Sequence, residues 1–140
     1  MLTGIAMQRF EEVEHTADWA FRAHGRDLAQ LFANAARGMF ELQGGAAEGE
    51  TSVARAIAVS GADRETLLVN WLNELLYLQE TQRERYSRFE ILEISDTHLR
   101  ACLHGCSHWP QGRIIKAVTF HNLEVKPSAT GWEATIVVDV

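Results

Sequence analysis

The stretch Leu67-Leu68-Val69-Asn70-Trp71-Leu72-Asn73-Glu74-Leu75-Leu76-Tyr77-Leu78 carries the strongest periodic pattern in the chain. Its large apolar residues recur at helical spacing, and they predict a helix over about residues 64–81. Burying side chains of this size stabilises a fold by about 1.5–3 kcal/mol each. We therefore expect this helix to cross a sheet at the centre of the fold, with Trp71, Leu72 and Leu75 buried. The polar members of the stretch are left to face solvent or a partner: Asn70, Asn73, Glu74 and Tyr77.

Outside this stretch, one more helix and several strands are expected. An apolar stripe at helical spacing predicts a helix over residues 28–42, capped by Asp27 and ended by Gly44-Gly45; Asp63 is the matching cap of the central helix. Alternating or apolar runs predict strands at residues 7–13, 19–24, 52–59, 89–94, 99–103, 114–125 and 132–138. Residues 95–98 and 126–131 are expected to be turns, and residues 46–50 and 104–112 loops. The sum is an α+β fold, a compact sandwich of about seven mostly antiparallel strands with two main helices packed on the sheet.

Composition narrows the class of protein. A chain of 140 residues with 46% hydrophobic and 23% charged residues fits a single domain, residues 1–140. Its net charge of -6 argues against non-specific wrapping of a nucleic-acid backbone. The densest basic cluster, Arg83, Arg85 and Arg88, is expected to be a solvated helix end. The sequence shows no membrane span or signal peptide, and two cysteines are too few for a disulfide scaffold, so we expect a cytoplasmic protein.

Three segments carry candidate site residues. Glu14-His15-Thr16-Ala17-Asp18 lies between two predicted strands, where its polar side chains either satisfy local backbone groups or hold a cation. In a regular strand, Lys116 and His121 point to opposite faces, and Asp139 points away from the apolar face that carries Trp132. Two carboxylates brought together repel unless a cation or proton lies between them. If Asp18 and Asp139 meet, they form an oxygen-rich site, completed by the C-terminal oxygens of Val140, that suits calcium or magnesium better than zinc.

A second possible metal site lies in Cys102-Leu103-His104-Gly105-Cys106-Ser107-His108. Two Cys and two His can bind zinc, but their every-other-residue spacing differs from the usual paired knuckles. The alternative is a buried Cys102 and surface histidines.

The residues resemble the archease family, whose members are protein cofactors of the GTP-dependent tRNA-splicing RNA ligase. Four pieces carry the resemblance in family order over nearly the whole chain: residues 14–18, 67–77, 115–123 and 139–140. Phe120 stands where the family usually has Tyr, a departure that removes a hydroxyl.

The resemblance implies an accessory protein and not an enzyme. Archeases promote guanylylation and multiple turnover of the ligase, so RNA is involved only through that partner. The family's metal site, with calcium, falls on Asp18, Asp139 and Val140. Lys116 matches a position linked to activation, and His15 and His121 are further candidates for that role.

Two other functions remain open at this stage. One is a metal-dependent phosphoester hydrolase that uses Asp18, Asp139 and His121, although the chain has no phosphate-cradling glycine loop. The other is a pure protein-interaction domain in which the metal only stiffens the chain terminus.

Overall fold

The computed structural model describes residues 10–13, 19–45, 52–109 and 112–140. Its elements, in chain order, are β1 Phe10–Val13, β2 Trp19–Gly25, α1 Leu28–Leu42, β3 Val53–Ser60, α2 Arg64–Gln82, β4 Arg85–Ile94, β5 His98–Cys106, β6 Ala117–Thr119, β7 Lys126–Ser128 and β8 Gly131–Asp139. The predicted α+β fold is confirmed, and both helices have the expected starts.

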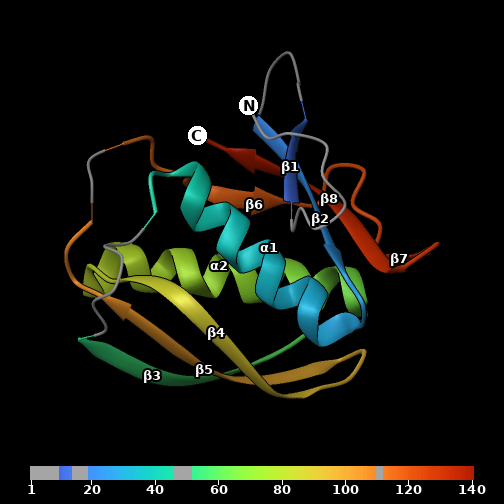
Figure 1. The fold of residues 1–140 in the computed structure, drawn as a ribbon, viewed down its shortest axis with the longest axis horizontal. Coiled ribbons are helices and arrows are strands. Elements are labelled where there is room, and N and C mark those ends of the chain that lie inside the picture. Colours follow the sequence, from blue (N-terminus) through green and yellow to red (C-terminus); the bar gives the residue numbers. More distant parts are fainter. Residues whose placement is uncertain (1–9, 14–18, 46–51, 110–111) are drawn as a thin grey trace.

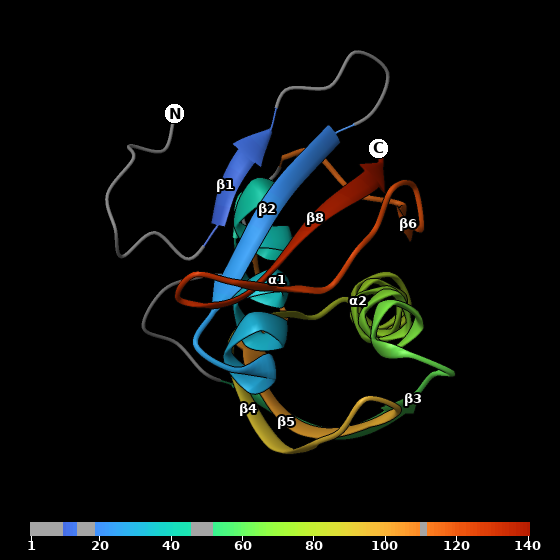
Figure 2. The same cartoon turned by 90° about the vertical axis from the view of Figure 1, so that its right-hand side faces the viewer.

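The two helices lie between two antiparallel sheets (Figures 1 and 2). One sheet has five strands in the order β1-β2-β8-β6, with β7 also paired to β8; the other has three strands in the order β3-β5-β4. Helix α1 contacts β2 and β4, and α2 contacts β3 and β6, so each helix touches both sheets. This arrangement refines the expectation of helices packed on a sheet, because the helices form the middle layer.

The position of α2 explains its sequence. A helix with a sheet on each side and another helix beside it is buried over most of its circumference, so consecutive residues such as Leu67, Leu68 and Val69 are all buried. Trp71, Leu72 and Leu75 are 0% exposed, which confirms the predicted core face. The Trp71 indole N–H donates to the Phe32 carbonyl at 3.0 Å, so α2 is joined to α1 by a polar contact inside the core.

Both helix starts follow from local chemistry. The Asp27 carboxylate accepts the Gln30 amide at 2.8 Å, and the Asp63 carboxylate accepts the Thr66 amide at 2.8 Å. Each bond satisfies one of the backbone donors left free at a helix N-terminus. Later in α1, Gly38 lets β1 approach, since an added Cβ would lie 2.9 Å from the Phe10 ring.

The β region differs from the expectation in several places. The long strand expected over residues 114–125 is wrong: only Ala117–Thr119 pairs with β8. The expected turn at residues 126–131 contains β7, which pairs with the start of β8. Strands β4 and β5 are longer than expected, so part of the expected loop at 104–112 belongs to β5.

The basic cluster was also misassigned in part. Arg83 and Arg88 are exposed, but Arg85 lies in β4 and is only 1% exposed. A buried arginine needs hydrogen-bond acceptors, and it finds them in side chains and carbonyls far away in sequence, which a local charge pattern does not show.

Candidate functional site

The candidate site lies where one end of the five-stranded sheet brings three distant segments together. Strand β8 pairs with β2 so that Trp19 lies opposite Val138, and it pairs with β6 so that Ala117 lies opposite Asp139. The Lys116 amide donates to the Asp139 carbonyl at 2.7 Å. Residues from positions 19, 116 and 139 are thus neighbours at one end of this sheet (Figure 2).

Asp139 lies where the alternation of β8 predicts. Val138 is 0% exposed and faces the core, whereas Asp139 and the following Val140 are exposed. Within the described ranges, the Asp139 carboxylate takes part in no ion pair. An exposed carboxylate at a strand end is accessible to a cation or to a partner.

Lys116 lies directly before β6 and is exposed. In a regular strand, Lys116 would point to the same face as the buried Val118, two positions later. Because β6 begins only at Ala117, this alternation does not apply to Lys116. Its ammonium forms no ion pair with any residue that the structure describes.

The segment before β6 contributes a residue that the sequence analysis missed. The Arg113 guanidinium lies over the Trp19 ring, 4.1 Å from its centroid, and the Arg113 side chain is exposed. Trp19 directly follows Asp18 in the sequence. The one signal in the sequence was the presence of an arginine, Arg113, three positions before Lys116. No sequence pattern connects Arg113 with Trp19, because the two residues lie far apart in the chain.

A buried polar network holds this segment in place. Ile115 is 2% exposed, and its amide donates to the Gln43 side-chain oxygen at 2.9 Å. The same oxygen accepts a hydrogen bond from the side-chain amide of Gln79 at 2.9 Å. The side-chain oxygen of Gln79 in turn accepts a hydrogen bond from the Arg85 guanidinium at 2.8 Å. Burial lowers the pKa of Arg85, which also donates to the Gln43 carbonyl. The network fixes Ile115, the residue directly before Lys116, to the core.

The polar side of α2 fixes β6. The Val118 amide donates to Asn73 Oδ1 at 2.8 Å, and Asn73 Nδ2 donates to the Val118 carbonyl at 3.2 Å. One asparagine therefore satisfies both outward backbone groups of an edge-strand residue. Asn70 acts similarly on β3, since its Nδ2 donates to the Ser60 carbonyl at 2.8 Å. Asn70 and Asn73 thus bond the protein's own strands. Of the four polar residues expected to face solvent or a partner, only Glu74 and Tyr77 have no such side-chain bond among the described residues.

The other candidate residues are not all brought to this site. His15 and Asp18 lie outside the described residues, so the meeting of Asp18 with Asp139 stays a prediction. His121 is exposed in a turn beyond the end of β6, where the Leu123 amide donates to the Phe120 carbonyl at 3.0 Å. Lys116 and His121 therefore lie at opposite ends of β6.

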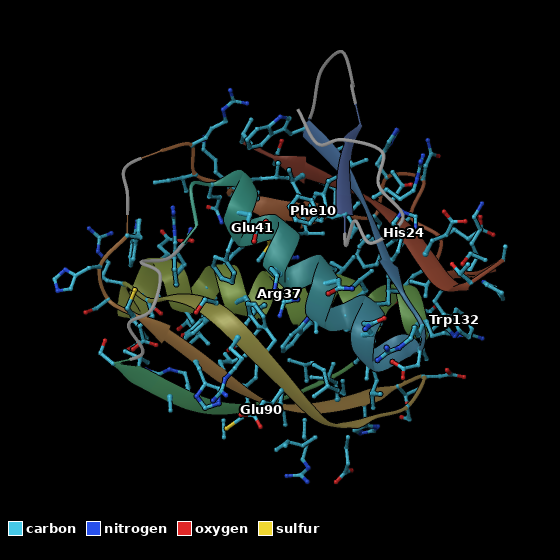
Figure 3. The ribbon with its side chains drawn as sticks, in the orientation of Figure 1. Phe10, His24, Arg37, Glu41, Glu90 and Trp132 are labelled. Carbon is cyan, nitrogen blue, oxygen red and sulfur yellow. The ribbon has the colours of Figure 1, made fainter. Side chains whose placement is uncertain are left out.

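The Cys102–His108 segment is not assembled as a zinc site. Cys106 is 1% exposed and its thiol donates to the His108 carbonyl at 2.7 Å. His104 contacts Glu90 at 2.5 Å, and Glu90 lies at the three-stranded sheet (Figure 3). Across the described parts of the chain, no group of three or more His, Cys, Asp or Glu side chains is placed to hold a metal ion.

The chain is similar to known proteins over nearly all its length. The Archease protein family matches residues 10–140. The chain belongs to the archease family. The protein archease of Methanosarcina acetivorans is 38% identical over 143 residues, which cover 95% of this chain and 97% of the relative. That of Methanothermobacter thermautotrophicus is 33% identical over 141 residues, covering 96% and 100%.

Solved structures agree with this archease assignment. The solution structure of Methanobacterium thermoautotrophicum protein 1598 is 32% identical, with a TM-score of 0.77, and the match covers 96% of this chain and 100% of that one. The crystal structure of an archease from Thermotoga maritima, described as a possible chaperone, shares the fold at 22% identity and a TM-score of 0.67, covering 91% and 94%. No helix in the described residues is long and apolar enough to cross a membrane.

Proposed function

We propose that this archease is an accessory protein of the GTP-dependent tRNA-splicing RNA ligase. In this role it promotes guanylylation and multiple turnover of the ligase, and it meets RNA only through that partner. Family membership supports the proposal, and the grouping of Lys116 and Asp139 at one sheet end is the observation that carries it.

The proposed metal site uses oxygen atoms of Asp18, Asp139 and Val140. Its support is the register of the sheet: Trp19, which follows Asp18, lies opposite Val138, which precedes Asp139. Carboxylates held near each other repel unless a cation lies between them. Carboxylate and carbonyl oxygens are the preferred ligands of calcium, which is the metal that we propose.

Apolar side chains around this site support a protein partner. The described part of the chain has five large hydrophobic residues that are strongly exposed. Ile114 and Val140 belong to the segments that form the site, and Phe120 follows the far end of β6. Tyr77 is 59% exposed and lies one helical turn beyond Asn73, which bonds β6. Grouped exposed apolar residues on a soluble domain typically mark an interaction surface.

Lys116 is the proposed activating residue. A lysine ammonium is a compact point charge that suits a phosphate oxygen, and guanylylation places nucleotide phosphates beside metal ions. His15 and His121 are kept as candidates for the same step, although His121 lies at the far end of β6.

The decisive test is a turnover assay of the cognate ligase at limiting concentration, scoring the guanylylated intermediate and several rounds of ligation. We expect Asp18→Ala, Asp139→Ala and Lys116→Ala to remain folded and to lose most of the stimulation. Asp96→Ala is the matched control, because Asp96 is an exposed aspartate at the turn between β4 and β5. Calcium titration by calorimetry should show a site that is lost in both candidate-ligand variants.

Each failure has a separate meaning. If the wild-type protein does not stimulate its ligase, the accessory role is wrong. If stimulation survives removal of both Asp18 and Asp139, the protein is an interaction domain whose metal is structural or absent. If the isolated protein cleaves phosphoesters with calcium or magnesium, the hydrolase alternative replaces the proposal.

A further inference from the structure

We propose that Arg113, held on Trp19, forms with Lys116 a binding site for the phosphates of the nucleotide that the ligase carries. This inference rests on the proposed accessory function and adds a residue and a ligand class to it. Arg113 would bind and orient the phosphates, and no bond of the nucleotide is made or broken by the archease itself.

The first support is the way in which Arg113 is presented. Its guanidinium carbon lies over the Trp19 ring, 4.1 Å from the centroid, and a cation–π contact of this kind restrains the side chain. A guanidinium has five N–H donors, so one held by its contact with an aromatic face still has donors for a bidentate contact with phosphate.

The second support is a comparison with two other arginines that lie over tryptophan rings. Arg64 lies over Trp132 but also pairs with Asp96 at 3.3 Å. Arg85 lies over Trp109 but is buried and donates to Gln79 and two carbonyls. Arg113 has no carboxylate or carbonyl acceptor in the described parts of the chain, so no residue there takes up its N–H donors.

The third support is the placement of Arg113 relative to Lys116. Between them, Ile115 is buried and bonded to Gln43, and the Lys116 amide is bonded to the Asp139 carbonyl. The backbone that carries both cations is thus bonded to the core at Ile115 and to β8 at Lys116. Three residues span at most about 10 Å, so both side chains can reach one polyphosphate group.

Charge favours phosphate as the ligand. The protein carries a net charge of -6, yet two exposed cations at this sheet end have no ion-pair partner among the described residues: Lys116, whose amide bonds the Asp139 carbonyl, and Arg113, which lies over Trp19. A nucleoside triphosphate brings several negative charges and bound metal ions, and it can contact both cations while its metal approaches the carboxylate. A carboxylate of the ligase would satisfy Arg113 as well, and the experiment below separates these two ligands.

The test measures ligase guanylylation as a function of GTP concentration in the presence of each archease variant. Arg113→Gln should raise the GTP concentration at half-maximal rate by about tenfold, since it removes a charge-assisted bidentate contact. Arg113→Lys should show a smaller rise, because it keeps the charge and loses the fork. Trp19→Leu should shift the value in the same direction by removing the platform.

Arg26→Gln is the matched control. Arg26 is exposed, and it follows the opposite end of β2, where Gly25 lies opposite Trp132. We expect this variant to behave as wild type, and circular dichroism and melting should show that Arg113→Gln and Arg113→Lys fold normally.

The outcomes distinguish this inference from the function on which it rests. Absence of stimulation by the wild-type protein overturns the accessory function. Normal stimulation together with equal GTP dependence of Arg113→Gln, Trp19→Leu and Arg26→Gln overturns the phosphate site alone. Weaker binding of Arg113→Gln to the ligase, with unchanged GTP dependence, assigns Arg113 to a ligase carboxylate and also overturns the phosphate site.

Discussion

Replacing Asn73 should loosen β6 while leaving the core of the protein intact. In the structure, Asn73 accepts the Val118 amide at 2.8 Å and donates to the Val118 carbonyl at 3.2 Å. Val118 is 4% exposed, so these two backbone groups have little access to water in the native fold. Asn73→Ala removes both partners at once and adds no bulk.

The magnitude follows from the number of bonds. A neutral hydrogen bond contributes about 0.5–1.5 kcal/mol net, so Asn73→Ala should lower the free energy of unfolding by about 1–3 kcal/mol. Asn73→Asp should cost at least as much at neutral pH, because a carboxylate oxygen replaces the donor that now faces the Val118 carbonyl. Asn70→Ala is the matched control: it removes a single bond, to the Ser60 carbonyl, from an exposed residue and should cost about 0.5–1 kcal/mol.

Denaturant titration of the three variants measures these losses, and hydrogen exchange locates them. The Val118 amide should exchange faster in Asn73→Ala than in wild type. The exchange rates of amides in the middle of α2 should change only as far as the global free energy of unfolding changes. Stimulation of the ligase should fall as well, since β6 positions Lys116 beside Asp139. Equal midpoints for Asn73→Ala and Asn70→Ala, together with unchanged protection of Val118, would refute this role for Asn73.

Two further predictions concern the core and an ion pair. Leu75→Ala should cost about 2–5 kcal/mol in denaturant titration, because Leu75 is 0% exposed between two sheets, and an unchanged midpoint would contradict that placement. The Arg55 guanidinium donates twice to the Glu84 carboxylate at 2.9 Å and lowers its pKa, so the pair stabilises the fold above the unfolded-state pKa of about 4.5. Glu84→Gln should therefore cost about 1–2 kcal/mol at pH 7, reduced by the partial exposure of Arg55, and the difference from wild type should shrink as pH falls below about 4. A difference that is constant from pH 7 to pH 3 would show that the carboxylate charge is not involved.

The parts of the fold that were predictable depend on local chemistry. Asp27 and Asp63 cap helices through bonds to residues three positions away, so the sequence window contains both partners. The apolar spacing of α2 likewise needs only its own residues. What this spacing does not reveal is that α2 has a sheet on each side, although its nearly continuous apolar surface is consistent with that position.

The parts that were not predictable depend on pairing between distant segments. Ile114 and Phe120 extend the apolar pattern of β6, but only Ala117–Thr119 of this segment pairs with β8, and both outer residues are exposed. Arg85 looked solvated because its acceptors, Gln43 and Gln79, come from two different helix ends. For the candidate site, the pattern placed Asp139 on the correct face of β8, but the contact between Arg113 and Trp19 joins positions far apart in the chain.

Helix α2 connects the stability of this archease to its candidate site. Its apolar surface supplies the core through Leu72 and Leu75, so substitutions there act on the whole fold. Its polar side bonds one edge strand of each sheet, through Asn70 at Ser60 and Asn73 at Val118. A change on the polar side alters the position of β6 without removing core contacts. Activity that is lost with little loss of stability should therefore map to Asn73 and the segment from Arg113 to Lys116, whereas activity lost by unfolding should map to the leucines.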